Sequence, residues 1–183
     1  MSTKVREHFA NIDPGYCMET SEQAVHELAK RLGARLLMKG MKLVTAESCT
    51  GGWIAKVLTD IAGSSDWFDC AIISYSNDAK KHFLKVPQGI LLDHGAVSEN
   101  TVIAMQQGIF METRADAGIS VSGIAGPGGG SEEKPVGTVW IATGLRDQMV
   151  HTRKFLFDGD RNQVRLQAVE AALRAMLEQL EHG

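Results

Sequence analysis

A serine in a glycine-rich turn is the residue of this chain best suited to chemistry. Ser48 lies in the run Ala46-Glu47-Ser48-Cys49-Thr50-Gly51-Gly52, between a strand predicted over 42–46 and a helix predicted to begin near Trp53. At such a junction the first N–H groups of the helix lack backbone partners, and the helix dipole is positive. This geometry suits either a phosphate-binding loop or a nucleophile placed beside donors for an oxyanion.

The residues around Ser48 restrict the roles that this turn can have. A P-loop carries a lysine after its last glycine, but here Gly51-Gly52 is followed by Trp53-Ile54, so an ATP-binding P-loop is excluded. The tandem glycines would let a ligand approach the backbone closely. Ser48 can also be a simple helix cap that accepts a hydrogen bond from the N–H of Thr50 or Gly51. The sequence therefore leaves a nucleophile and a cap open.

A serine nucleophile needs a base, and Lys80 is the best candidate. It lies in Tyr75-Ser76-Asn77-Asp78-Ala79-Lys80, where Asn77 is predicted to cap a short helix and Lys80 to occupy its third position. The helix dipole and partial burial would lower the pKa of the amine, so that a neutral lysine could accept the hydroxyl proton. Tyr75, at the end of the preceding strand, would orient the lysine or the substrate. The alternative is a solvated lysine beside Lys81.

The other nucleophiles and bases are weaker candidates. Cys49 would be acidified at a helix N-terminus, but it can act only if its neighbour Ser48 points away. The six histidines are scattered, and His94 is predicted to be a hydrogen-bonding loop residue just before a helix. Because no Ser-His-Asp set is evident, we prefer the serine–lysine pair.

An arginine lies at the start of the last predicted helix. Arg161 follows Asp158-Gly159-Asp160, and a guanidinium beside helix N–H groups is a suitable clamp for phosphate or carboxylate. The same arginine could instead pair with Asp158 or Asp160. Lys134, in the small-residue loop 123–137, could likewise be a solvated charge.

Alternating strands and helices are predicted to position these residues. Strands are expected over 42–46, 69–75, 117–121, 138–143 and 149–157. Helices are expected from Thr20 to Gly40, from near Trp53, after Asn77, from Ser98 and from near Asp160, with Thr20 and Gln23 as a capping box for the first. The last two strands must be antiparallel because only the short turn 145–148 joins them.

This order of elements predicts the architecture. We expect a single α/β domain, layered α/β/α, with a mixed sheet and one antiparallel hairpin. The domain is predicted to cover residues 20–183, with residues 1–19 as an N-terminal extension. Glycine-rich segments follow three strands, and strand ends at one edge of an α/β sheet meet at the ligand site. We therefore expect the three segments to share one crevice.

The composition limits the class of protein. The 183 residues have a formal charge of -3, with 44% hydrophobic and 22% charged residues, as is typical of one globular domain. The negative charge argues against binding nucleic acid by phosphate neutralisation. No apolar run reaches the roughly 18 residues of a membrane helix, and the N-terminus lacks a signal peptide's apolar core. We therefore expect a cytoplasmic protein with neither nucleic acid nor membrane as partner.

The cysteines do not predict a disulfide or a metal site. Cys17, Cys49 and Cys70 are an odd number without paired spacing, which indicates reduced thiols. No cysteine–histidine cluster has the spacing of zinc ligands, so no structural metal is expected.

Six blocks of the sequence, in one consistent order over about residues 22–180, resemble a known family. They are Ala46-Glu47-Ser48-Cys49-Thr50-Gly51-Gly52, Tyr75-Ser76-Asn77-Asp78-Ala79-Lys80, His94-Gly95-Ala96-Val97-Ser98, Gly123-Ile124-Ala125-Gly126-Pro127-Gly128-Gly129, Lys134-Pro135-Val136-Gly137-Thr138-Val139 and Gly159-Asp160-Arg161. The family that they resemble is the CinA C-terminal domain family, whose enzymatic members are nicotinamide-nucleotide amidohydrolases.

The resemblance implies an activity and its catalytic residues. The activity is hydrolysis of the carboxamide of nicotinamide mononucleotide to nicotinate mononucleotide and ammonia, in the recycling of pyridine nucleotides. In that family the serine of the first block is the nucleophile, and the lysine and tyrosine of the second assist it. The implied catalytic residues here are Ser48, Lys80 and Tyr75. No metal or organic cofactor is implied, and a homodimer is expected because the family tends to associate.

The resemblance also implies the substrate contacts. The backbone N–H groups of Thr50 and Gly51 would hold the oxyanion, and the third glycine-rich segment, 158–161, with Arg161 would hold the ribose and the phosphate. The expected substrate-binding residues are Thr50, Gly51, Asn77, Gly123, Gly126, Gly128 and Arg161.

Two other functions remain open on the sequence. A non-catalytic module could use the same crevice to sense a nucleotide or to bind a protein partner. A hydrolase of a different amide or ester could share the serine–lysine pair. Removal of Ser48 would distinguish the non-catalytic module, which has no turnover to lose, from an enzyme. Substrate profiling would distinguish a hydrolase of a different amide or ester from the nicotinamide-nucleotide amidohydrolase.

Overall fold

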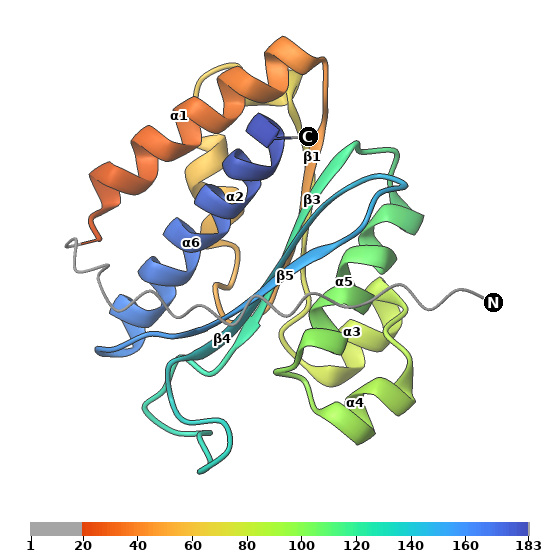
Figure 1. The fold of residues 1–183 in the computed structure, drawn as a ribbon, viewed down its shortest axis with the longest axis vertical. Coiled ribbons are helices and arrows are strands. Elements are labelled where there is room, and N and C mark those ends of the chain that lie inside the picture. The colour runs from red at the N-terminus through yellow and green to blue at the C-terminus, as the bar shows by residue number, and fades with distance from the viewer. Residues whose placement is uncertain (1–19, 183) are drawn as a thin grey trace.

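The computed structural model describes residues 20–182, and the extension predicted over 1–19 lies outside the described residues. Figure 1 shows a central sheet with helices on both faces. Its five strands are arranged in the order β2-β1-β3-β4-β5. They are β1 (Leu43–Glu47), β2 (Phe68–Ile73), β3 (Ala117–Gly123), β4 (Thr138–Leu145) and β5 (His151–Leu156).

The sheet is mixed. β1 pairs in parallel with β2 and β3, whereas β4 is antiparallel to β3 and to β5. A short turn between β4 and β5 leaves no room for the crossover that a parallel pair needs. The predicted mixed sheet with one antiparallel hairpin is therefore confirmed.

The helices form two layers, one on each face of the sheet (Figure 1). One layer contains α1 (Glu22–Lys39), α2 (Trp53–Thr59) and α6 (Arg161–His182). The other contains α3 (Asn77–Leu84), α4 (Gln88–His94) and α5 (Glu99–Glu112). Each layer has its own apolar cluster against the sheet, which confirms the predicted α/β/α arrangement. No helix of residues 20–182 combines the length and the apolar character needed to cross a membrane.

Several predicted element ends differ from the observed ends. The predicted cap Thr20 is wrong, because the Ser21 side chain accepts from the Ala24 N–H at 3.1 Å and begins α1. Gly40 ends that helix as predicted, with φ of 63°, in the left-handed region that glycine adopts without steric penalty. The helix α4 was not predicted; among its seven residues only Leu91 is buried, so it has little apolar periodicity.

Two corrections concern the candidate site. The side chain of Ser76, rather than that of Asn77, caps α3 by accepting from the Ala79 N–H at 3.0 Å. Lys80 is therefore the fourth helical residue rather than the third. The strand β2 ends at Ile73, so Tyr75 lies in the loop after the strand rather than at its end.

Candidate active site

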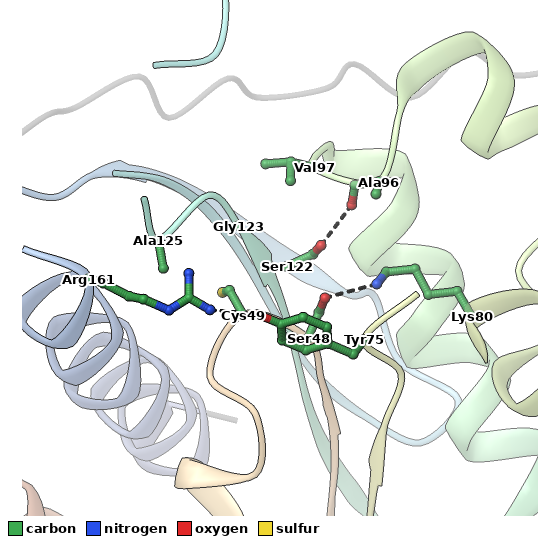
Figure 2. Close-up of a pocket in the computed structure, with 10 residues that line it drawn as sticks. All are labelled: Ser48, Cys49, Tyr75, Lys80, Ala96, Val97, Ser122, Gly123, Ala125 and Arg161. Carbon is green, nitrogen blue, oxygen red and sulfur yellow. Dashed lines mark hydrogen bonds between the residues drawn. The ribbon is translucent and has the colours of Figure 1, made fainter. Parts of the chain in front are cut away.

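The glycine-rich segments meet at a pocket beyond the carboxyl ends of the parallel strands. Figure 2 shows this pocket, which has a volume of about 190 Å³. Its lining includes five of the predicted catalytic and substrate-binding residues: Ser48, Tyr75, Lys80, Gly123 and Arg161. The remaining lining residues are Cys49, Ala96, Val97, Ser122 and Ala125. All three segments thus reach the same cavity, as their positions at strand ends predict.

The pair Ser48–Lys80 is buried at the base of this pocket. The Lys80 Nζ lies 2.9 Å from the Ser48 Oγ and donates a hydrogen bond to the Ser74 carbonyl at 2.7 Å. Lys80 is only 1% exposed and Ser48 7%, so the alternative of a solvated surface lysine is wrong. Lys80 and Leu84 are the buried residues of α3, and their i, i+4 spacing places both on its inner face.

Burial sets the protonation of Lys80. Loss of solvation lowers the pKa of the amine from its ordinary value of 10.5 to about 8, opposed only by a small effect of Cys49. A neutral amine keeps two N–H donors and gains a lone pair. It can then accept the Ser48 hydroxyl proton while an N–H still donates to the Ser74 carbonyl. The pair therefore has the geometry and the pKa that base activation of a serine requires.

Glu47, rather than Ser48, caps the helix that follows the turn. This carboxylate is fully buried. Its oxygens accept five hydrogen bonds at 2.7–3.3 Å, from the hydroxyls of Thr45 and Thr50 and the N–H groups of Gly52, Ile54 and Ala55. Because Glu47 accepts hydrogen bonds from the N–H groups at the start of α2, the Ser48 hydroxyl is not needed as a cap and faces Lys80. The capping alternative for Ser48 is therefore not the observed arrangement.

We expect Glu47→Gln to lower the free energy of unfolding by about 2–3 kcal/mol. An amide has one acceptor oxygen in place of two, and its NH₂ group would face a buried backbone N–H. Urea unfolding of the variant and the wild type measures the difference. Glu27→Gln, which removes only an exposed ion pair with Lys30, is the control and should change stability by about 0.5 kcal/mol or less. Equal effects of the two substitutions would contradict the capping role of Glu47.

Cys49 is a poor nucleophile in this environment. Its thiol is 6% exposed, and burial raises its pKa to about 12. A neutral thiol reacts slowly because the thiolate is the reactive form. Cys49 and Cys70 are free thiols, as predicted, and Cys17 lies outside the described residues.

Arg161 and Tyr75 contact each other at the pocket. The Arg161 guanidinium donates to the Tyr75 Oη at 2.6 Å and to the Gly126 carbonyl at 2.7 Å. The alternative partner Asp160 instead accepts from two backbone N–H groups at the start of α6, at 2.8 and 2.9 Å. Arg161 is thus held by loop backbone and by Tyr75, and no acidic side chain among residues 20–182 forms an ion pair with it.

Five of the expected substrate-binding residues do not line the pocket. Gly51 donates its N–H to the Ser48 carbonyl at 3.0 Å, so in this conformation that group is not available to an oxyanion. The Thr50 side chain is buried against Glu47. Gly126 contributes its carbonyl to Arg161, whereas Asn77 and Gly128 are exposed.

Sequence reasoning missed two residues that hold the turn. Glu47 was overlooked because the neighbouring serine is a common cap. Arg165, on α6, donates to the carbonyls of Cys49 and Thr50 at 3.1 and 2.7 Å. Its position four residues after Arg161 places both arginines on one face of the helix, but this spacing does not indicate which backbone groups Arg165 contacts.

The remaining candidate cation, Lys134, donates to the His94 carbonyl at 2.7 Å and lies outside the pocket that contains Ser48. His94 is the last residue of α4, so the prediction that it lies in a loop is wrong. Over residues 20–182, no three His, Cys, Asp or Glu side chains form a group that could hold a metal ion.

Comparison with known proteins gives matches over most of the chain. The family description "CinA C-terminal domain" matches residues 25–180. The chain is 48% identical over 159 residues to the nicotinamide-nucleotide amidohydrolase PncC of Escherichia coli (strain K12), covering 87% of this chain and 96% of that protein. It is 52% identical over 157 residues to the nicotinamide-nucleotide amidohydrolase PncC of Enterobacter agglomerans, with 86% and 96% covered.

The fold matches solved structures as well. A CinA superfamily protein from Klebsiella pneumoniae 700603 superposes with a TM-score of 0.84 at 41% identity, covering 87% of this chain and 99% of that chain.

Proposed function

The chain belongs to the CinA C-terminal domain family, and from this premise we propose that it is a nicotinamide-nucleotide amidohydrolase. The substrate would be nicotinamide mononucleotide, and the products nicotinate mononucleotide and ammonia. Relatives named for this activity are 48% and 52% identical over most of the chain. The observation that carries the proposal is the buried contact of 2.9 Å between Lys80 and Ser48 inside the pocket.

The proposed reaction begins with attack by Ser48. Neutral Lys80 accepts the hydroxyl proton as the Oγ forms a bond to the carboxamide carbon, and the carbonyl oxygen becomes an oxyanion. Lys80 then gives this proton to the amide nitrogen, which leaves as ammonia when the C–N bond breaks. A serine ester of the nicotinoyl group remains.

Water completes the proposed reaction. Lys80, neutral again, accepts a proton from a water molecule that attacks the ester carbonyl. The C–Oγ bond then breaks, and Lys80 returns the proton to Ser48. The net change is one water consumed and one ammonia released, so the pair alone balances all proton transfers.

Tyr75 and Arg161 are suited to orient the nucleotide. The Tyr75 hydroxyl accepts from Arg161, which leaves its own proton free to donate to the carboxamide or to Ser48. Tyr75 and Ser48 both line the pocket (Figure 2). The Arg161 guanidinium has further N–H donors, which suit a ribose hydroxyl or a phosphate oxygen.

Ammonia release by the purified protein tests the proposed function. We expect release from nicotinamide mononucleotide and little from free nicotinamide, which lacks the ribose and phosphate that Arg161 would hold. Hydrolysis of free nicotinamide at an equal or higher kcat/KM would contradict the proposed substrate. The absence of any amide hydrolysis, together with nucleotide binding, would favour a sensing module.

We expect kcat/KM to rise with pH and to reach half its maximum near pH 8. The base must be neutral, and with a pKa of about 8 for Lys80 only about a tenth of the molecules carry a neutral amine at pH 7. Initial rates between about pH 6 and pH 10 in buffers of constant ionic strength give the profile. A rate that is flat or falls over this range would contradict Lys80 as the base.

A further inference from the structure

We infer that Lys134 is a positioning residue for the proposed reaction: it attaches residues 127–134 to a turn that walls the pocket, and this closed arrangement is the one that binds the nucleotide. This inference rests on the proposed function. Lys134 does not line the pocket that contains Ser48, and it is not among the expected catalytic or substrate-binding residues. Its effect would pass through the backbone of two pocket walls.

The first wall is the turn 94–97 between α4 and α5, two of whose residues line the pocket (Figure 2). Three successive carbonyls of this turn accept hydrogen bonds from side chains. Lys134 holds the first of them, because its Nζ donates to the His94 carbonyl at 2.7 Å. The donors to the other two carbonyls are Ser98, Thr101 and Ser122, at 2.7–3.0 Å. The position of this wall therefore depends on side-chain donors, of which Lys134 is one.

The second wall begins where β3 ends, and Gly123 and Ala125 line the pocket there. Arg161 holds this wall by donating to the Gly126 carbonyl at 2.7 Å. The chain then continues into residues 127–134, which we call the flap. Among the residues that the structure describes, one hydrogen bond joins the flap to another part of the chain, and it is the bond from the Lys134 Nζ to turn 94–97.

The flap has little else to hold it in place. Residues 127–133 are all exposed, and they include the run Gly128-Gly129-Gly130, which has the largest backbone freedom of any residue type. Its remaining hydrogen bonds are internal. The Ser131 N–H donates to the Lys134 carbonyl at 2.9 Å, and the Lys134 N–H donates to the Ser131 Oγ at 3.2 Å. This local turn ends the flap at Lys134, so that one ammonium group attaches the whole flap.

The acceptor of Lys134 is well suited to an ammonium group. His94 is the last residue of α4, so its carbonyl lies at the negative end of the helix. Gly95 follows with φ of 74°, and the Lys134 Nζ packs 3.4 Å from where a Cβ would lie. The N–H of the same peptide group donates to the Leu91 carbonyl at 3.1 Å. Both polar atoms of this peptide are therefore bound, and loss of Lys134 frees one of them.

A second cavity, of about 470 Å³, separates this role from direct contact with a phosphate. Val97 lines both cavities, so the end of the flap lies next to the first pocket. The charged lining of the second cavity is Asp93, Glu99, Glu133, Lys134 and Lys154, with His94 beside them. A phosphate there would meet three carboxylates and only two ammonium groups. We therefore assign Lys134 to the flap rather than to the phosphate.

The test compares Lys134→Met with Lys154→Met, which removes the same charge from the same cavity. Lys154 is exposed, and its ammonium donates no hydrogen bond within residues 20–182. A ligand that binds only the closed arrangement has an apparent affinity proportional to the closed fraction. We expect Lys134→Met to raise KM about 3- to 10-fold and to change kcat by about twofold or less, since Ser48 and Lys80 keep their contact. Lys154→Met should keep the wild-type KM, and equal KM in both variants would overturn the inference.

Nicotinamide riboside, which lacks the phosphate, distinguishes the flap contact from a phosphate contact. If Lys134 acts through the pocket walls, Lys134→Met weakens binding of the riboside and of the mononucleotide by the same factor. The two affinities are measured as KM or as inhibition constants. A loss confined to the mononucleotide would mean that Lys134 binds the phosphate, and this would overturn the inference.

Amide hydrogen exchange tests the flap contact without any nucleotide. We expect the amides of Gly95 and Ser131 to exchange at least about threefold faster in Lys134→Met than in the wild type, with the amides of α3 unchanged. Unchanged exchange at Gly95 would overturn the inference. Faster exchange in the variant, together with a wild type that releases no ammonia, would support the flap contact and refute the proposed substrate alone.

Discussion

Ser48→Ala is expected to lower kcat/KM for nicotinamide mononucleotide by about 10⁴- to 10⁶-fold, the order of magnitude of the loss when one member of a coupled catalytic set is removed. The variant retains the pocket and Arg161, so the nucleotide should still bind. Among the described residues the Ser48 hydroxyl has one hydrogen-bond partner, Lys80, and Lys80 keeps the Ser74 carbonyl as an acceptor. The free energy of unfolding should therefore fall by only about 1 kcal/mol.

Ammonia release and thermal unfolding of the same preparations measure both effects. Ser65→Ala is a suitable control, because Ser65 is exposed and does not line the pocket. A residual activity above about a tenth of the wild-type rate in Ser48→Ala would contradict the covalent mechanism. Such a result would favour direct attack by water activated by Lys80.

Lys80→Met is expected to lower kcat/KM by about 10³- to 10⁵-fold, since the nucleophile stays but loses its base. Methionine has a similar length and no charge, so it fills the same buried position. Lys81→Met is the control: Lys81 is the next residue of α3, and its amine forms an exposed ion pair with Asp78. It should keep wild-type activity. Activity of Lys80→Met near that of Lys81→Met would contradict the role of Lys80.

The same variant tests the pKa of Lys80 through stability. The folded-state pKa of about 8 lies below the ordinary 10.5, so between these values the unfolded chain binds more protons than the folded one. Stability of the wild type relative to Lys80→Met must then rise with pH across this window. We expect a rise of about 2 kcal/mol between about pH 7 and pH 9.5 in urea unfolding. A constant or falling difference would contradict a depressed pKa.

Much of the fold was predictable because its signals are local. The buried strands β1 and β3 are short apolar runs between turn residues, and the turn between β4 and β5 allows only an antiparallel pair. Gly40 ends α1 where a left-handed residue is needed. Element ends were less predictable, because Thr20 and Ser21, or Ser76 and Asn77, are adjacent residues of similar capping ability.

Residue types alone could suggest the contact between Ser48 and Lys80, but they could not establish it. The two residues are 32 positions apart, and only the parallel pairing of β1 with β2 brings their loops together. The burial of Lys80 depends on which face α3 turns to the core. In the sequence only the apolar residue Leu84, one turn later, indicates that face, and a single residue is a weak indication. The pKa of about 8 follows from that burial.

The contacts that hold the turn were not predictable for a different reason. Arg165 reaches Cys49 and Thr50 across more than a hundred residues, from a helix at the other end of the sequence. Glu47 is adjacent to Ser48, but a buried carboxylate is rare enough that sequence reasoning assigns the cap to serine instead. Both residues act by satisfying backbone groups, which leave no pattern of side-chain types in the sequence.

The most direct test of the proposed mechanism is capture of the serine ester during turnover. Wild-type protein is mixed with nicotinamide mononucleotide in the presence of increasing hydroxylamine, which competes with water for an acyl group. If Ser48 forms the ester, part of the product becomes the hydroxamate, its share rises with hydroxylamine concentration, and Ser48→Ala forms none. Formation of the acid alone at every hydroxylamine concentration that the protein tolerates, at an undiminished rate of ammonia release, would contradict a covalent intermediate on Ser48.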